Sequence, residues 1–251
     1  MLHEARDGGV CVLRLDRPPA NAIDETLLAD LAAALDTARA DDAVRAVVLT
    51  GTGRFFSAGF DFAAPRRDAA AEQRISALYR EAHVKLLTLP KPTIAMMNGH
   101  AVAGGLVMVL ACDCRFGIDG VYRVGLTEVA VGAAFPRAAF EIVRLRLPQA
   151  RATELLLGAV LYPASAAVRL GIIDELVPPN VFETTVLRHA TRLAGMPREA
   201  YAHAKALLVA DAAAHVASES AEDAQQMLAV WSAPESRAAR ARQREKLGLK
   251  S

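Results

Sequence analysis

Two glycine-bearing stretches, SAGFD at residues 57–61 and NGHAVAGG at residues 98–105, decide the expected fold of this chain. Each stretch follows a β-branched run and precedes a helical pattern. Glycine lets the chain turn without a Cβ clash, and a helix that begins at such a turn has N–H donors without partners. The two turns therefore predict a pair of backbone donors aimed at one point, which suits an oxyanion hole.

The commoner glycine motifs do not fit these stretches. The sequence GTG at residues 51–53 would need a glycine at position 56 for the dinucleotide fingerprint, and Phe56 stands there. No glycine is followed by Lys-Ser or Lys-Thr, as a phosphate loop requires. Ser57 has Phe55 two residues before it, where the nucleophile elbow of a hydrolase has glycine. These three classes of site are therefore not expected.

The length and composition indicate one large globular core with a helical appendage. The chain has 251 residues, of which 53% are apolar and only 5% aromatic, so small side chains favour close helix packing. We expect a core over residues 1–196, with a soft boundary near Met196-Pro197, and a C-terminal helical region over residues 197–251. A formal charge of +1 gives no reason to expect a nucleic-acid partner.

The cysteines, the N-terminus and the apolar runs favour a reduced, cytoplasmic protein. Cys11, Cys112 and Cys114 are odd in number and form no Cys-x-x-Cys pair, so neither a disulfide framework nor a zinc site is indicated. The six histidines do not have the spacing of metal ligands, and we expect no metal. The start of the chain has no apolar signal core, and the nearly apolar stretch 101–112 is too short to span a bilayer.

The hydrophobic pattern alternates between strands and helices. The order strand, glycine turn, helix occurs twice, over residues 45–60 and 93–112, which predicts a spiral of alternating strands and helices. Asp24 is the expected N-cap of the first helix. Further strands are expected at 10–15, 115–118, 122–124 and 171–178, and further helices at about 66–89, 137–147 and 150–158 and throughout the C-terminal part.

Four short motifs carry a resemblance to a known family. They are PANA at residues 19–22, FSAGFD at 56–61, PTIA at 92–95 leading to Asn98-Gly99, and GLTEV at 125–129. In order and spacing, over almost the whole chain, they resemble the crotonase (enoyl-CoA hydratase/isomerase) superfamily. The resemblance implies an α/β spiral of ββα repeats, acyl-CoA thioesters as ligands, no cofactor beyond the coenzyme A of the substrate, and a homotrimer or dimer of trimers with C-terminal helices as the oligomerisation region.

The resemblance also implies three catalytic groups. The backbone amides of Phe60 and Gly104 align with the two oxyanion-hole donors of the family, the alternative being two simple tight turns. Glu128 stands where the family has a catalytic glutamate. Its surroundings, from Val124 to Gly132, are apolar, so burial would raise its pKa toward the range useful to a general base. An exposed loop glutamate or a structural ion pair is the alternative for this residue.

Val107 is the informative departure from the family pattern. Hydratases of the family carry a second glutamate at this place, and the two carboxylates together hold the water that adds to the double bond. Val107 cannot orient water, whereas Glu128 alone can move a proton from C2 to C4. The sequence therefore favours Δ3-to-Δ2 enoyl-CoA isomerisation, with an enoyl-CoA hydratase as one alternative and a non-catalytic acyl-CoA-binding protein as another.

The expected substrate and CoA contacts gather around the same turns. They comprise Ala22, Ala58, Phe60, Asp61, Gly104 and Val107.

Other polar residues near the motifs have more than one interpretation. For Asp61, Asp113 and His100 we favour a structural role, and Arg17 and Arg54 are possible phosphate contacts. The basic run over residues 237–246 suits CoA phosphates or a neighbouring subunit, and equally a solvated helix face.

Overall fold

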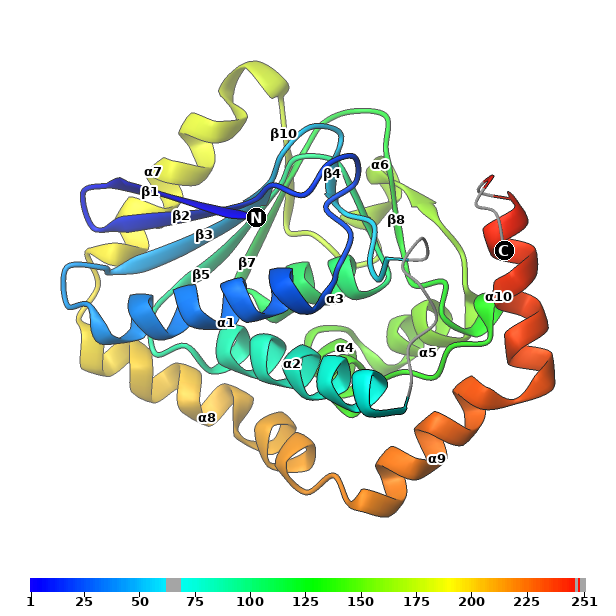
Figure 1. Ribbon diagram of the computed structural model, residues 1–251. Coiled ribbons are helices and arrows are strands. Elements are labelled where there is room, and N and C mark those ends of the chain that lie inside the picture. The colour runs from blue at the N-terminus through cyan, green and yellow to red at the C-terminus, as the bar shows by residue number, and fades with distance from the viewer. Residues whose placement is uncertain (62–68, 247, 249–251) are drawn as a thin grey trace.

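The computed structural model describes residues 1–61, 69–246 and 248, and within them the strands form two sheets with helices packed around them (Figure 1). The larger sheet has the order β1-β2-β3-β5-β7-β10 and the smaller sheet the order β4-β6-β8-β9. The pairs β1/β2 and β8/β9 are antiparallel and the others are parallel. The strands are β1 (Leu2–Asp7), β2 (Val10–Leu15), β3 (Ala46–Gly51), β4 (Phe55–Ser57), β5 (Thr93–Met97), β6 (His100–Val102), β7 (Cys114–Ile118), β8 (Arg123–Gly125), β9 (Tyr162–Pro163) and β10 (Glu175–Val177).

The helices lie on both faces of the larger sheet and then wrap around the smaller one. Helix α7 covers one face, while α1, α2 and α3 lie on the other (Figure 1). The helices are α1 (Glu25–Ala40), α2 (Ala69–Thr88), α3 (Gly104–Ala111), α4 (Arg137–Arg146), α5 (Gln149–Gly158), α6 (Ala164–Ala167), α7 (Phe182–Ala194), α8 (Arg198–Ala217), α9 (Ala221–Ser232) and α10 (Pro234–Lys246), with 3-10 turns η1 (Val129–Val131) and η2 (Pro179–Val181).

The chain repeats one unit, in which a strand of the larger sheet leads to a strand of the smaller sheet and then to a helix. The units are β3-β4-α2, β5-β6-α3 and β7-β8-α4. The predicted spiral of ββα repeats is confirmed. The two strands and the helix of the third unit were predicted, but not as a repeat, because η1 stands between its second strand and its helix in place of a glycine turn.

Several element boundaries differ from the prediction for local reasons. The expected strand 171–178 forms only over Glu175–Val177, because Gly171 has φ +74° and the amide of Ile172 turns back to the carbonyl of Ala167. Helix α2 begins at Ala69, and the first residues of the expected span lie outside the described residues. Asp24 caps α1 as predicted, accepting a hydrogen bond from the amide of Leu27 at 2.8 Å. Strands β1, β4, β6 and β9 were missed.

The alternation of side chains along the strands divides the core between the two faces of the larger sheet. Val10 and Val12 pack under α7, whereas Cys11 and Leu13 point to the face that α1 covers. Both sets are buried, as expected for strands with helices on each side. The larger sheet is therefore the rigid base on which the glycine turns rest.

Helix α8 docks on this base through a buried ion pair. Lys205 donates to Asp113 at 2.7 Å and to the carbonyl of Lys91 at 3.2 Å, and Tyr201 donates to Asp113 at 3.0 Å. Asp113 thus has the structural role that its position suggested. Because α8 packs against α2 and α4, the described chain continues into its C-terminal helices without an open hinge, and the division at residues 196 and 197 remains a prediction.

Candidate active site

The two glycine turns lie in direct contact. A Cβ added at Gly59, where φ is +78°, would stand 2.7 Å from the Cβ of Ala103 and 3.3 Å from the amide nitrogen of Gly104. A Cβ added at Gly105 would stand 2.5 Å from the carbonyl oxygen of Ser57. The main chains can approach this closely only because both positions are glycine. The structure therefore brings the two predicted donors together.

Both donors are available. Among the described residues, the amides of Phe60 and Gly104 donate no hydrogen bond, whereas the amide of Gly59, just before Phe60, donates to the hydroxyl of Ser57 at 3.2 Å. Gly104 is the first residue of α3, so its N–H lies at the positive end of that helix. It follows Ala103, whose φ of +52° is strained for a residue with a Cβ. Such a pair can accept a carbonyl oxygen that becomes negatively charged.

Asn21 holds the first turn in place, and sequence reasoning did not single it out. Its side-chain amide donates to the backbone carbonyls of Phe55 at 2.8 Å and Thr52 at 3.1 Å. Its backbone carbonyl accepts a hydrogen bond from the hydroxyl of Ser57 at 2.7 Å. Its φ of +49° is one that asparagine tolerates better than most residues. The motif PANA contained the signal, but only the folded chain shows which segments this asparagine joins.

Arg17 braces the same turn. Its guanidinium pairs with Asp24 at 2.8 Å and with Asp61 at 2.6 Å, and it also donates to the carbonyl of Ala22 at 3.3 Å. Burial lowers the pKa of Arg17, but the two carboxylates outweigh that effect and the net pKa is raised. Two carboxylates already occupy Arg17, so the suggested phosphate contact is not favoured. Asp61 instead has the structural role expected of it.

The remaining predicted contact residues gather at the turns to different degrees. Ala22 and Ala58 are half-buried beside Phe60. Val107 is fully buried on α3, one helical turn after Gly104 and therefore on the same side of the helix.

The residues at the outer end of the second turn lie apart from this cluster. His100 accepts from the amide of Arg123 at 3.2 Å and stacks on Phe55, which fits the structural role expected of it. Burial lowers its pKa. Arg54 is exposed.

Glu128 is half-buried, and one of its carboxylate oxygens is unused. It stands between β8 and η1, and its Oε2 is buried with no hydrogen-bond partner. Burial raises its pKa to about 7, although the backbone N–H groups of Thr127 and Glu128 itself act in the opposite direction. A carboxyl group with this pKa is close to half ionised at neutral pH, so it can both take and return a proton.

Tyr79 on α2 connects Glu128 to the glycine turns. A Cβ added at Gly104 would stand 3.1 Å from Cε2 of Tyr79, and the charge of Glu128 helps burial to raise the pKa of the same tyrosine. Its ring packs on Phe60 with 5.3 Å between centroids and on His83 with 3.8 Å. Tyr79 therefore contacts the residues that carry both amides and feels the charge of Glu128, and sequence reasoning did not identify it.

His83 lies behind this group and is not a base at neutral pH. Burial lowers its pKa to about 4, and its Nδ1 lies 2.8 Å from the carbonyl oxygen of Tyr79. Its Nε2 lies 3.5 Å from the carbonyl oxygen of Gly104. His83 is therefore neutral and supports the stack.

Helix α10 packs against the turn that carries Glu128. Arg240 donates to the carbonyl of Gly132 at 2.8 Å and also to the carbonyl of Trp231, over whose ring its guanidinium lies at 4.8 Å. A Cβ on Gly132 would stand 2.5 Å from Cα of Ser236, so the helix sits directly on the end of η1. One arginine of the basic C-terminal run thus binds its own chain.

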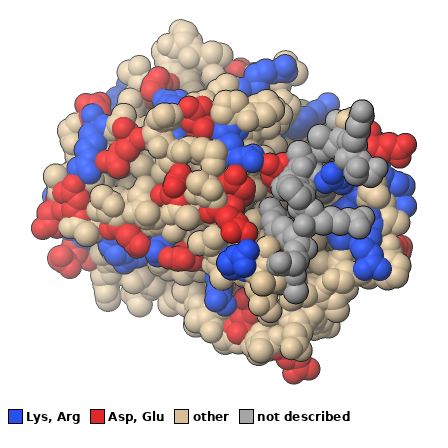
Figure 2. All heavy atoms as spheres, in the orientation of Figure 1, with Lys and Arg blue, Asp and Glu red and all other residues tan. Residues whose placement is uncertain are grey.

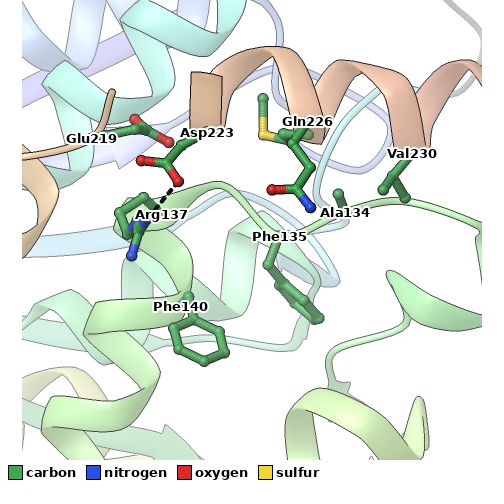
Figure 3. Close-up of a pocket in the computed structure, with 9 residues that line it drawn as sticks. Ala134, Phe135, Arg137, Phe140, Glu219, Asp223, Gln226 and Val230 are labelled. Carbon is green, nitrogen blue, oxygen red and sulfur yellow. Dashed lines mark ion pairs between the residues drawn. The ribbon is translucent and has the colours of Figure 1, made fainter. Parts of the chain in front are cut away.

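A cavity of about 320 Å³ lies beyond η1, between α9 and the segment that leads into α4 (Figure 3). An ion pair between Arg137 and Asp223, 3.2 Å long, closes one end. Its lining comprises Ala134, Phe135, Arg137, Phe140, Glu219, Asp223, Gln226, Met227 and Val230. None of the expected catalytic groups belongs to this lining, so the chemistry is better placed at the glycine turns.

The charged side chains on the face drawn in Figure 2 do not form one large patch of a single sign. On the face in Figure 2, the positive and negative side chains are interspersed. Within residues 1–61, 69–246 and 248, no group of three or more His, Cys, Asp or Glu side chains is arranged to hold a metal ion. In the same described part of the chain, no helix is both long enough and apolar enough to cross a membrane.

Known proteins resemble this chain in both sequence and fold. A family model described as enoyl-CoA hydratase/isomerase matches residues 5–249. A probable enoyl-CoA hydratase of Mycobacterium avium is 34% identical over 80% of this chain and 79% of its own length. A 4-chlorobenzoyl coenzyme A dehalogenase of an Arthrobacter species is 35% identical over 75% and 70%. The human mitochondrial Δ3-Δ2-enoyl-CoA isomerase has a TM-score of 0.93 at 25% identity, with 98% of each chain covered.

Proposed function

Because the chain belongs to the enoyl-CoA hydratase/isomerase family and has the α/β crotonase fold, we propose that it converts Δ3-enoyl-CoA thioesters into their Δ2 isomers. The amides of Phe60 and Gly104 hold the thioester oxygen. Glu128 removes a proton from C2, and the negative charge of the resulting dienolate gathers on that oxygen. Glu128 then returns the proton to C4, so the double bond moves and nothing is added or lost.

The proton-transfer role rests on the pKa of Glu128. At about 7, it leaves a large fraction of the carboxylate ionised for proton removal and makes the carboxylic acid strong enough to give the proton back. The two amide donors are fixed before substrate arrives, so they need little reorganisation as charge develops. The main-chain amides of Phe60 and Gly104 thus stabilise the negative charge, and the side chain of Glu128 moves the proton.

The observation that carries the proposal is a single carboxylate whose buried Oε2 has no partner, together with an apolar residue at position 107. Hydration needs a second polar group to orient water, and Val107 offers none. Isomerisation needs only the one carboxylate. The likeness to the human isomerase over 98% of both chains supports the same choice.

A hydratase is the alternative, favoured by the similarity to the probable enoyl-CoA hydratase of Mycobacterium avium. It would require another group to orient water beside Glu128. A non-catalytic acyl-CoA-binding protein is the remaining alternative, and the perturbed pKa of Glu128 counts against it.

Purified protein assayed with Δ3-hexenoyl-CoA and Δ2-hexenoyl-CoA separates the three. We expect isomerisation of the first to exceed hydration of the second by at least about tenfold in kcat/KM. Faster hydration than isomerisation would establish the hydratase, and binding of both thioesters without turnover would establish the non-catalytic protein.

We also propose a homotrimer or a dimer of trimers. Leu207 and Leu208 on α8 are 67% and 62% exposed in the single chain, and α9 has no buried residue among those described. Burial of such surface between subunits is the usual outcome. Sedimentation should give about 80 or 160 kDa for a 26.7 kDa chain. A stable, fully active monomer of the chain without residues 197–251 would contradict this assembly. The cytoplasmic location also stays a prediction.

A further inference from the structure

Tyr79 is placed where a bound thioester would meet a third polar group. Its ring lies between the side chain of Phe60 and the imidazole of His83. Its hydroxyl oxygen would be 3.6 Å from a Cβ added at Gly104, so the phenol crosses the start of α3 beside the second donor. The residue is 1% exposed, and this position is fixed by aromatic packing on both sides.

The hydroxyl of Tyr79 has no partner of its own. Among the described residues, hydrogen bonds are recorded for the backbone carbonyl of Tyr79, which lies 2.8 Å from Nδ1 of His83, and none for its hydroxyl. It makes none to Glu128 either, so the two groups are neighbours that influence each other by charge alone. A hydroxyl with free bonding capacity thus lies beside the start of α3, where the free amide of Gly104 stands, and its ring packs on Phe60, which carries the other free amide.

We propose that the hydroxyl of Tyr79 is a third hydrogen-bond donor to the thioester oxygen, beside the amides of Phe60 and Gly104. This inference rests on the proposed function, because the oxygen needs a third donor only if charge gathers on it. A neutral phenol can donate one hydrogen bond, and that bond strengthens as the oxygen becomes an enolate oxygen. The proton that moves from C2 to C4 travels on Glu128, and Tyr79 keeps its own proton throughout.

The fold does not need this hydroxyl. Phenylalanine has the same ring and would keep the contacts with Phe60 and His83, so Tyr79→Phe removes the donor and little else. Tyr122 provides a control, because its hydroxyl is buried without a hydrogen-bond partner. That hydroxyl lies near Gly117 of β7 and Ile173, and the ring of Tyr122 meets His100 edge-on at the outer end of the second turn, with 6.3 Å between centroids.

The first test is kinetic. Tyr79→Phe should lower kcat for Δ3-hexenoyl-CoA by about 10- to 100-fold with KM changed by less than about threefold, whereas Tyr122→Phe should stay within about twofold of wild type. If the kcat of Tyr79→Phe stays within about twofold of the wild-type kcat, the inference is overturned.

The second test asks whether the thioester oxygen is the acceptor. Tyr79→Phe should weaken binding of butyryl-CoA by several-fold but leave binding of its thioether analogue, which lacks that oxygen, unchanged. Equal weakening of both ligands overturns the assignment, because the hydroxyl would then act through shape. If wild type binds butyryl-CoA but turns over neither enoyl-CoA, the proposed function fails, and the binding comparison still decides the contact of Tyr79.

A third variant guards against a folding defect in Tyr79→Phe. Replacing Tyr79 with 3-fluorotyrosine keeps the hydroxyl in the same packing. It should therefore retain at least about half of the wild-type kcat. If this variant loses as much activity as Tyr79→Phe while its thermal midpoint matches that of wild type, the hydroxyl is not the donor.

Discussion

The two sides of the candidate site are built in opposite ways. The donor side consists of main-chain amides at Phe60 and Gly104, held by glycines packed against each other with no room for a Cβ. The proton-transfer side consists of one side chain, Glu128, on a short turn against which α10 rests. The donor side is therefore part of the fold itself, whereas the carboxylate can be changed without disturbing its supports. Each prediction below tests that separation.

Replacing Glu128 with glutamine should have the largest effect on turnover. The amide keeps the size of the side chain but cannot accept the C2 proton, so kcat should fall by about 10² to 10⁴. Binding of butyryl-CoA should remain within about threefold of wild type, because the donor side is untouched. Steady-state kinetics and calorimetric titration measure the two quantities. Retained turnover would contradict the role of Glu128. Glu183→Gln, at an exposed side chain on α7, is the neutral control.

Replacing Gly59 with alanine should damage both fold and turnover. The new Cβ would lie 2.7 Å from that of Ala103, and φ is +78°, so the turn must shift and carry the Phe60 amide with it. We expect kcat to fall by about 10² to 10³ and the free energy of unfolding to fall by about 2–4 kcal/mol.

Gly53→Ala is the matched control for Gly59. Gly53 also has a positive φ, of +67°, but a Cβ there would meet nothing within 4 Å. Its cost should be backbone strain alone, about 1 kcal/mol, with normal turnover. If Gly59→Ala and Gly53→Ala lose the same turnover and the same stability, close packing is not the reason why the donor side rejects a Cβ at Gly59.

The stability of wild type should fall with pH in a way that Glu128→Gln abolishes. The folded state holds the proton of Glu128 up to a pKa of about 7, against 4.5 for the ordinary carboxyl, so folding becomes less favourable as pH rises between these values. The difference amounts to about 3 kcal/mol above pH 8 and vanishes below pH 4. Urea unfolding of both proteins across this range measures it. If the unfolding free energies of wild type and Glu128→Gln change in parallel with pH, the pKa of Glu128 is not raised in the folded state.

Replacing Val107 with glutamate should have the smallest effect. A second carboxylate would supply the missing group for orienting water, so hydration of Δ2-hexenoyl-CoA should rise, by less than about tenfold. The gain is limited because Leu106 and Met108 are fully buried apolar neighbours and the new acid would stay largely protonated. Val107→Gln serves as the control without a base. Unchanged hydration in Val107→Glu would show that the residue at position 107 does not determine the reaction.

The parts of the fold that sequence predicted are those with local signals. The glycine turns, the N-cap at Asp24 and the order of strand and helix all follow from patterns a few residues long. Strand β1 was missed because its side chains are mostly exposed and charged, so it lacks an apolar alternation. The strands and the helix of the third ββα unit were predicted, but they were not recognised as a repeat, because η1 replaces the glycine turn that marks the other two.

The candidate site was predictable where a motif touched it and not elsewhere. Phe60, Gly104 and Glu128 lie in motifs, and burial raises the pKa of Glu128 in the expected direction. Tyr79 sits in an ordinary amphipathic helix, and only tertiary packing brings it to Gly104. Arg17 was named as a possible phosphate contact, and its ion pairs could not be foreseen, because one of the two partners lies 44 residues away in the chain.

The packing of the glycine turns limits which mutations this gene can accept. Every base change that replaces glycine with another amino acid adds a Cβ, and at Gly59 and Gly105 the space for one is already occupied. Valine codons, by contrast, become glutamate or aspartate codons through one change at the second base. A lineage carrying this fold could therefore gain or lose the acid at position 107 in a single mutational step, while the oxyanion turns remain fixed. Divergence in chemistry should thus be faster than divergence in architecture.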